Sequence, residues 1–148
     1  MSRENVEVVR RLYAELGQAT RDGELPDLAT RPALAALLHP DVELHGTIGG
    51  LSEGSVARGP EGVAKFMADD GQEWDEVVFE PQEFVDVEDR VVVLQRERRR
   101  GRHSGLELAA DTAAVLWLRD GLVRRAVGYM DQAEALAAAG LPPRASRG

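Results

Sequence analysis

The stretch AAVLW at residues 113–117 constrains the fold of this chain more than any other feature. It belongs to a long strand-like run over residues 105–119, and both faces of that strand are apolar. One face carries Ala114 and Leu116, and the other carries Ala113, Val115 and Trp117. Helices of the same chain can cover one face, whereas the other face would be exposed to water in a monomer. The run therefore predicts a central strand and a homodimer that covers Val115 and Trp117.

Further strand-like runs surround this one. The run over residues 76–88 is interrupted at Pro81, because proline cannot donate a hydrogen bond to a neighbouring strand. The pair Asp120-Gly121 is typical of a tight hairpin turn between the last two strands. The runs cover residues 76–88, 90–100 and 122–130. Together they predict an antiparallel meander.

The N-terminal half shows helical spacing. Apolar residues recur every three to four positions over residues 2–21, and a second helix is expected from Thr30, with Pro32 in its first turn. It would bury Leu34, Leu37 and Leu38. His39, before Pro40, is interpreted as a structural residue that caps the end of this helix.

The remaining segments complete an α+β pattern. A short strand is expected over residues 41–46, a flexible loop over 46–59, and a helix from Gly59 to about Gly71. A closing helix is expected from Asp131, its N-cap, to Ala139. We expect a single domain at residues 1–140 and a flexible tail at 141–148.

Composition narrows the classes of function. The net charge of −8 disfavours binding to nucleic-acid backbones, and the chain has no cysteine and no long apolar span. We therefore expect a cytoplasmic protein that needs no membrane, no nucleic acid and no cofactor. Three histidines without a ligand-like spacing predict no metal site. The arginine-rich residues 96–103 are interpreted as a strand that continues into solvent, although a nucleic-acid or acidic-partner patch was the alternative.

Six segments, in order, resemble the SnoaL-like superfamily, which includes ketosteroid isomerases, polyketide cyclases, limonene epoxide hydrolases and nuclear transport factor proteins. The segments are ENVEVVRRLYAEL, LLHPDVEL, GPEGVAKF, EFVDVEDRVVVL, LRDG and YMDQAEALAAAGL. The resemblance covers nearly the full chain. It implies a cone-shaped, curved antiparallel sheet wrapped by N-terminal helices around a central pocket, and a dimer through the outer face of the sheet.

The catalytic positions of these families are only partly occupied. Tyr13 matches the oxyanion-hole tyrosine of ketosteroid isomerases, and His45 falls where their general base stands. Ala114 and Gly128 replace the acids of the isomerases and cyclases, and of the epoxide hydrolase residues only Arg96 remains. An inward-facing Arg96 would need an anionic partner.

Two functions follow as hypotheses. The first is a protein that binds a small apolar or weakly acidic organic ligand in a mostly apolar pocket and lacks the usual catalytic acids. The second is an enzyme of the isomerase, cyclase or hydrolase type, with His45 as general base and Tyr13 as oxyanion donor. The predicted ligand-binding residues are Tyr13, Leu44, His45, Phe66, Met67, Arg96, Thr112, Ala114, Leu116, Gly128 and Tyr129.

Overall fold

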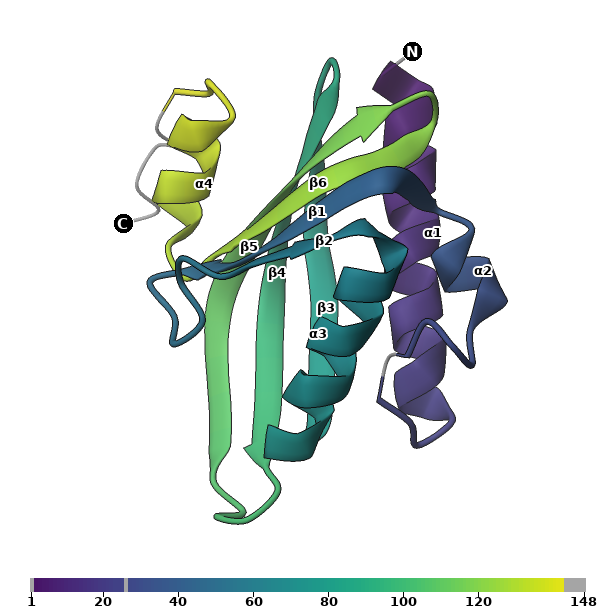
Figure 1. The fold of residues 1–148 in the computed structure, drawn as a ribbon. Helices are drawn as coiled ribbons and strands as arrows, with labels where there is room; N and C mark the ends of the chain where they lie inside the picture. The colour runs from purple at the N-terminus through teal and green to yellow at the C-terminus, as the bar shows by residue number, and fades with distance from the viewer. Residues whose placement is uncertain (1, 26, 143–148) are drawn as a thin grey trace.

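The computed structural model describes residues 2–25 and 27–142, in which six strands form one curved, unclosed sheet of order β2-β1-β6-β5-β4-β3 (Figure 1). The inner face of the sheet packs against α1 and α3, and the outer face packs against α4. The predicted α+β fold is confirmed. The elements are α1 (Ser2–Arg21), α2 (Pro32–Ala35), β1 (Leu38–Ile48), β2 (Val56–Arg58), α3 (Gly59–Glu73), β3 (Trp74–Val87), β4 (Arg90–Gly101), β5 (Glu107–Arg119), β6 (Leu122–Tyr129) and α4 (Gln132–Ala138).

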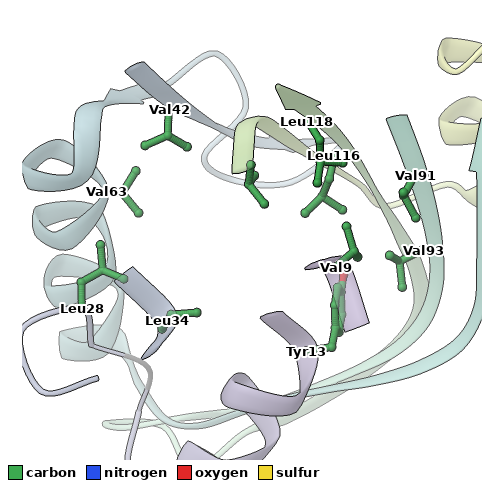
Figure 2. Packing of buried hydrophobic residues seen from close by; sticks show 11 residues of the cluster. Val9, Tyr13, Leu28, Leu34, Val42, Val63, Val91, Val93, Leu116 and Leu118 are labelled. Atoms are coloured by element: carbon green, nitrogen blue, oxygen red, sulfur yellow. The ribbon is translucent and has the colours of Figure 1, made fainter. Parts of the chain in front are cut away.

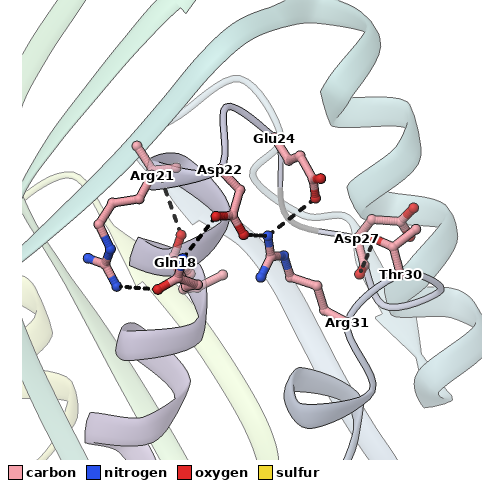
Figure 3. A network of polar contacts seen from close by, with 9 residues as sticks. Gln18, Arg21, Asp22, Glu24, Asp27, Thr30 and Arg31 are labelled. Carbon is pink, nitrogen blue, oxygen red and sulfur yellow. Dashed lines mark hydrogen bonds and ion pairs between the residues drawn. The ribbon is translucent and has the colours of Figure 1, made fainter.

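The segment after α1 folds back along the end of that helix and is held by Arg31 (Figure 3). Its Nη2 donates to Asp22 at 2.7 Å and to Glu24 at 3.2 Å. The hydrogen bond from Arg31 lowers the pKa of the Asp22 carboxyl. This polar bridge fixes the segment that carries Leu28, which is buried in the inner core.

The second helix is shorter than predicted. It ends at Ala35, and the chain enters β1 at Leu38, which pairs in parallel with Val123 of β6. The Val123 N–H donates to the carbonyl of Leu37 at 2.9 Å, so pairing with β6 replaces the last helical turn that the sequence suggested. The prediction that His39 caps a helix is wrong. His39 lies in β1, where its Nδ1 accepts from the backbone N–H of Asp41 at 3.0 Å.

The flexible loop expected at residues 46–59 is largely a hairpin. β1 continues to Ile48, and β2 returns antiparallel to it. Gly46 lies where the hairpin closes, because a Cβ at this position would approach the carbonyl oxygen of Ser52 to 1.8 Å. No side chain fits there, so this glycine fixes the hairpin.

The other strand predictions are confirmed. β3, β4, β5 and β6 form the antiparallel meander, with a register shift in β3 between Pro81 and Glu83. Asp120 and Gly121 both have positive φ in the turn between β5 and β6, as the sequence pair indicates. The helix predicted from Gly59 is α3, which extends two residues beyond Gly71.

The inner core lies between the sheet, α1 and α3. Figure 2 shows its side chains pointing towards one another from these elements. The most deeply buried members are Val9, Leu34, Val91, Val93 and Val123. Their burial follows from the helical stripe of α1 and from the alternation of β4, in which Val91 and Val93 face inwards.

The outer face carries a second core, which α4 covers. Ala135, Leu136 and Ala139 pack against Val92, Leu94, Ala113, Val115, Val127 and Tyr129 of the sheet. Val115 is 0% exposed within one chain. α4 therefore covers Val115 within one chain, whereas Trp117 is only partly buried, and the homodimer stays a prediction.

The closing helix begins as predicted. Asp131 accepts at Oδ1 from the backbone N–H of Ala133 at 2.8 Å and caps α4. Leu141, the first residue of the expected tail, donates its N–H to the Leu136 carbonyl and packs against the outer core. Residues 143–148 of that tail lie outside the described residues. Over the described part of the chain, no helix is long and apolar enough to cross a bilayer.

Candidate functional site

Two polar side chains are buried on the inner face of the sheet, Gln95 at 4% and Thr112 at 1% exposure. They are direct cross-strand partners on β4 and β5. Gln95 follows Val91 and Val93 on the same side of β4, and Thr112 precedes Ala114 and Leu116 on β5. Because burial of an unpaired polar group is costly, each should have a partner.

Hydrogen bonds connect these side chains into one chain. The Tyr13 hydroxyl donates to Gln95 Oε1 at 2.5 Å, and Gln95 Nε2 donates to Thr112 Oγ1 at 3.1 Å. The Thr112 hydroxyl then donates to Glu97 Oε1 at 3.2 Å. Every donor points towards Glu97, so the bonds polarise one another in the same direction. We call Tyr13, Gln95, Thr112, Glu97 and Arg99 the polar cluster.

Tyr13 is the innermost member of the polar cluster. It is 8% exposed, and its ring meets Phe84 edge to face, with centroids 5.8 Å apart. Burial, and to a lesser degree the negative charge of Glu97, raises the pKa of the Tyr13 phenol well above its ordinary value of 10.0. Tyr13 therefore keeps its phenol proton at neutral pH. The hydroxyl donates this proton to Gln95 and has no second one to offer.

Glu97 and Arg99 form the outer end of the polar cluster. Arg99 donates from Nε to Glu97 Oε2 at 2.6 Å, and its Nη1 donates to Asp70 on α3 at 3.2 Å. Its guanidinium also lies over the rings of Trp74 and Phe79, at 5.3 and 5.6 Å from their centroids. The Glu97 side chain is 15% exposed and that of Arg99 is 20% exposed. The chain of hydrogen bonds thus runs from the core to a partly open end of the inner face.

The sheet itself opens beside Glu97 and Arg99. The pairing of β5 with β6 ends at Ala113, and the Thr112 carbonyl accepts from the Gln132 side chain at 3.0 Å, so the part of β5 before Thr112 has no strand partner on this side among the described residues. Leu108 is the cross-strand partner of Arg99 and is 48% exposed. Solvent therefore reaches the inner face where the polar cluster ends.

Several predicted ligand-binding residues line the apolar part of this face. Leu44, Met67 and Ala114 pack partly buried against the inner core, and Leu116 is buried within it. Thr112 belongs to the polar cluster, as does Tyr13. Phe66 is half-buried on α3 and belongs to neither core. The structure thus brings Tyr13, Thr112 and the four apolar residues to one face of the sheet.

His45 lies elsewhere. It pairs with Val127 in the parallel register of β1 and β6, and Val127 belongs to the outer core. The neighbouring Leu44 faces inwards, so His45 faces outwards. Its Nε2 is 3.0 Å from Glu43 Oε1, and this hydrogen bond lowers the pKa of the Glu43 carboxyl. His45 and Tyr13 therefore lie on opposite faces and form no acid–base pair.

Two other predicted positions face outwards. Arg96 pairs with Asp111 at 3.2 Å on the outer face, and Arg98 pairs there with Glu80 at 2.8 Å. These acids offset the charges of Arg96 and Arg98. Tyr129 packs in the outer core under α4. Arg96 thus does not take the inward placement considered for it, and Tyr129 lies on the opposite face of the sheet from Tyr13.

Gly128 does face inwards, as the cross-strand partner of Ala114. The space beside it is filled by Thr47 of β1, whose Oγ1 would be 2.7 Å from a Cβ at this position. Glycine is thus needed for the close approach of β1 and β6, and no ligand is required to explain it.

Gln95, Glu97 and Arg99 were missed as site residues, although the sequence carried a signal. In RVVVLQRERRR, residues 95, 97 and 99 share the face of residues 91 and 93. The clustered arginines predict a solvent-facing strand, and the residue that the family resemblance indicates there, Arg96, is one position away from the inward-facing set. Which residues of this strand face inwards can be decided only from the register of the strand pairing and from the positions of the two cores.

Other features of the surface lie away from the polar cluster. A recess of about 360 Å³ lies on the outer side around Glu43, Arg58 and Arg124. Another, of about 710 Å³, lies between the start of α1 and two hairpin turns and includes Glu88 and Asp120. Among the described residues, no group of three or more histidines, cysteines and carboxylates is arranged to hold a metal ion.

Comparison with known proteins gives a consistent picture. A family model described as a SnoaL-like domain matches residues 9–126. No curated protein sequence gives a significant match. The solved structures described next are less than 25% identical to this chain in sequence, so their similarity shows the fold alone.

Three solved structures illustrate the fold. An NTF2-like protein of unknown function from Burkholderia pseudomallei is 24% identical, with a TM-score of 0.70 over 93% of this chain and 97% of that one. A SnoaL-like polyketide cyclase assigned as putative, from Jannaschia, is 20% identical, with a TM-score of 0.71 over 97% and 96% of the two chains. TerC, co-crystallised with polyporic acid, is 24% identical, with a TM-score of 0.68 over 93% and 98%.

Proposed function

The chain belongs to the SnoaL-like domain family, and from this premise we propose that it binds a small organic molecule on the inner face of its sheet, beside Thr112 and Glu97. The family comprises proteins that share a fold and differ in function. The proposal therefore rests on the residues of this chain. Its site is the open end of the inner face, where the polar cluster meets apolar side chains.

The observation that carries the proposal is the chain of hydrogen bonds from Tyr13 to Glu97. A polar network inside an apolar core is costly unless all of its members have partners. The network of this chain ends on the partly exposed carboxylate of Glu97, which accepts one hydrogen bond at each oxygen from the residues that the structure describes.

The surroundings fit a small, mostly apolar ligand. Met67 and Ala114, which are partly buried, supply apolar surface, and the partly exposed carboxylate of Glu97 supplies fixed polar atoms beside the buried hydroxyl of Thr112. Ligand sites in proteins commonly combine these two elements. TerC, which has the same fold, was crystallised with polyporic acid, and this supports the idea that such a fold can accept an organic molecule.

The enzymatic alternative has no comparable support. It relied on His45 as general base beside Tyr13, and a base must reach the proton that it removes. His45 is on the outer face, with Glu43 as its partner. We therefore propose binding and assign no reaction.

A screen of apolar organic compounds by thermal shift, followed by calorimetric titration of the hits, tests the proposal. A ligand that binds the native state raises the melting temperature. For a hit bound beside the polar cluster, Thr112→Val and Glu97→Gln should each weaken binding, by roughly tenfold where the lost contact is a hydrogen bond to a charged group. The matched outer-face variants His45→Gln and Glu80→Gln should leave affinity unchanged. Binding that His45→Gln abolishes and Glu97→Gln leaves intact would contradict the proposal.

A further inference from the structure

The polar cluster has an uneven supply of donors and acceptors. The hydroxyl protons of Tyr13 and Thr112 are both spent within it, on Gln95 and Glu97. Among the described residues, Glu97 accepts one hydrogen bond at each carboxylate oxygen, from Thr112 and Arg99. A carboxylate has about four acceptor positions, so roughly two remain free on Glu97. The open end of the cluster therefore offers acceptors.

The charges at the open end of the polar cluster are also predominantly those of acceptors. Arg99 is the cation of the group, and it lies between two carboxylates, those of Glu97 and Asp70. Its guanidinium is also held over the rings of Trp74 and Phe79. One positive and two negative charges leave a net charge of −1 on these three side chains. A further carboxylate from a ligand would meet repulsion that Arg99 cannot offset.

We propose that the ligand of this site presents a neutral O–H donor, as a phenol or enol does, to the free acceptor positions of Glu97, and that carboxylate ligands are rejected. This inference rests on the proposed function and adds the chemical class of the ligand. An inward-facing Arg96 would have bound a carboxylate of the ligand, but Arg96 pairs with Asp111 on the outer face. Apolar carbon atoms of the ligand then lie against Phe79, the cross-strand partner of Glu97, and against Met67 and Ala114.

Three matched compounds test this directly by calorimetric titration and by amide chemical-shift mapping. 4-Propylphenol carries the donor, 4-propylanisole has the same shape without a donor, and 4-propylbenzoate is an anion. The phenol should bind roughly tenfold or more tightly than the anisole, because the bond that it adds is to a charged acceptor. The benzoate should bind most weakly.

Variants test whether the preference for phenol over anisole depends on Glu97. Glu97→Gln keeps the side-chain shape and removes the charge, so the preference for phenol over anisole should fall into the range of about two- to tenfold that is typical of a neutral hydrogen bond. Glu80→Gln, on the outer face of the neighbouring strand, should keep the native preference. If Glu97→Gln does not fold, Asp70→Asn gives the second readout, because it should narrow the gap between phenol and benzoate.

The outcomes separate the two proposals. Equal binding of phenol and anisole at the amides of residues 95–99 and 110–114 would overturn the ligand class and leave the proposed function intact. Tightest binding by the benzoate would do the same. Failure of all three compounds to bind or to shift these amides, together with an empty screen, would overturn the proposed function itself.

Discussion

The hydroxyl of Tyr13 on α1 donates a 2.5 Å hydrogen bond to Gln95 on β4, across 82 residues of sequence. This contact joins the first helix to the centre of the sheet, where both side chains are buried. It also begins the series of donors that ends on Glu97. The bond therefore has two consequences, one for stability and one for the site.

Replacement of Tyr13 by phenylalanine should destabilise the protein by about 1–3 kcal/mol, because Gln95 would keep a buried acceptor without a donor. Tyr129→Phe is the matched control, since Tyr129 is equally buried on the outer face and its hydroxyl makes no hydrogen bond to another described residue. Chemical denaturation of both variants measures the difference. Equal, small effects would show that the Tyr13 hydroxyl contributes little.

Stability should fall above pH 10 in part through Tyr13. Burial raises the pKa of its phenol above the ordinary value of 10.0, so the folded state keeps a proton that the unfolded state loses. The contribution is complete below pH 10.0 and is lost as pH rises towards the folded-state pKa. Urea midpoints measured across this range should decline more steeply for the native protein than for Tyr13→Phe. Parallel declines would remove Tyr13 from the explanation.

Gly128→Ala should cost about 1–3 kcal/mol through overpacking against Thr47, a β-branched side chain with little freedom to turn away. The double variant Thr47→Ala with Gly128→Ala removes Thr47 Oγ1, the atom that the new Cβ would approach most closely, and should recover most of the lost stability. Thr47→Ser with Gly128→Ala keeps the Oγ and should recover less. If neither second change restores stability, the close contact does not explain this glycine.

The outer face should be sensitive to changes in α4. Leu136 is 4% exposed and packs on the outer core, so Leu136→Glu should displace the helix and expose the sheet. By light scattering, the native chain should have a mass near 16.1 kDa, and the variant should associate. A native mass twice this value, halved by Trp117→Glu, would instead support the dimer that the sequence suggested.

Local patterns predicted most of the elements correctly. α1 and α3 follow from helical spacing, and β3 to β6 follow from alternation and turn residues, all of which are short-range signals. The start of β1 at Leu38 and the hairpin with β2 could not be predicted in this way. They depend on pairing with β6 and on the tight contact at Gly46, which involve residues far apart or the path of the backbone.

The site was predicted less well for a related reason. Tyr13 and Thr112 were named and lie in the polar cluster, whereas Arg96 and His45 face outwards. Along a strand, one residue changes the face, so a small error in alignment exchanges Arg96 for the inward-facing Glu97. The cover over Val115 was also missed, because the position of α4 on the sheet is not a property of its own sequence.

Amide chemical-shift mapping during a titration with 4-propylphenol tests the central claim most directly. If the inner face binds small organic molecules, the largest shifts should occur at residues 95–99 on β4 and 110–114 on β5, and the amides of Glu43 and His45 should stay unchanged. Glu97→Gln should reduce the shifts at a given concentration. Shifts centred on β1 around His45, or none at any residue while all screened compounds also fail to bind, would contradict the account.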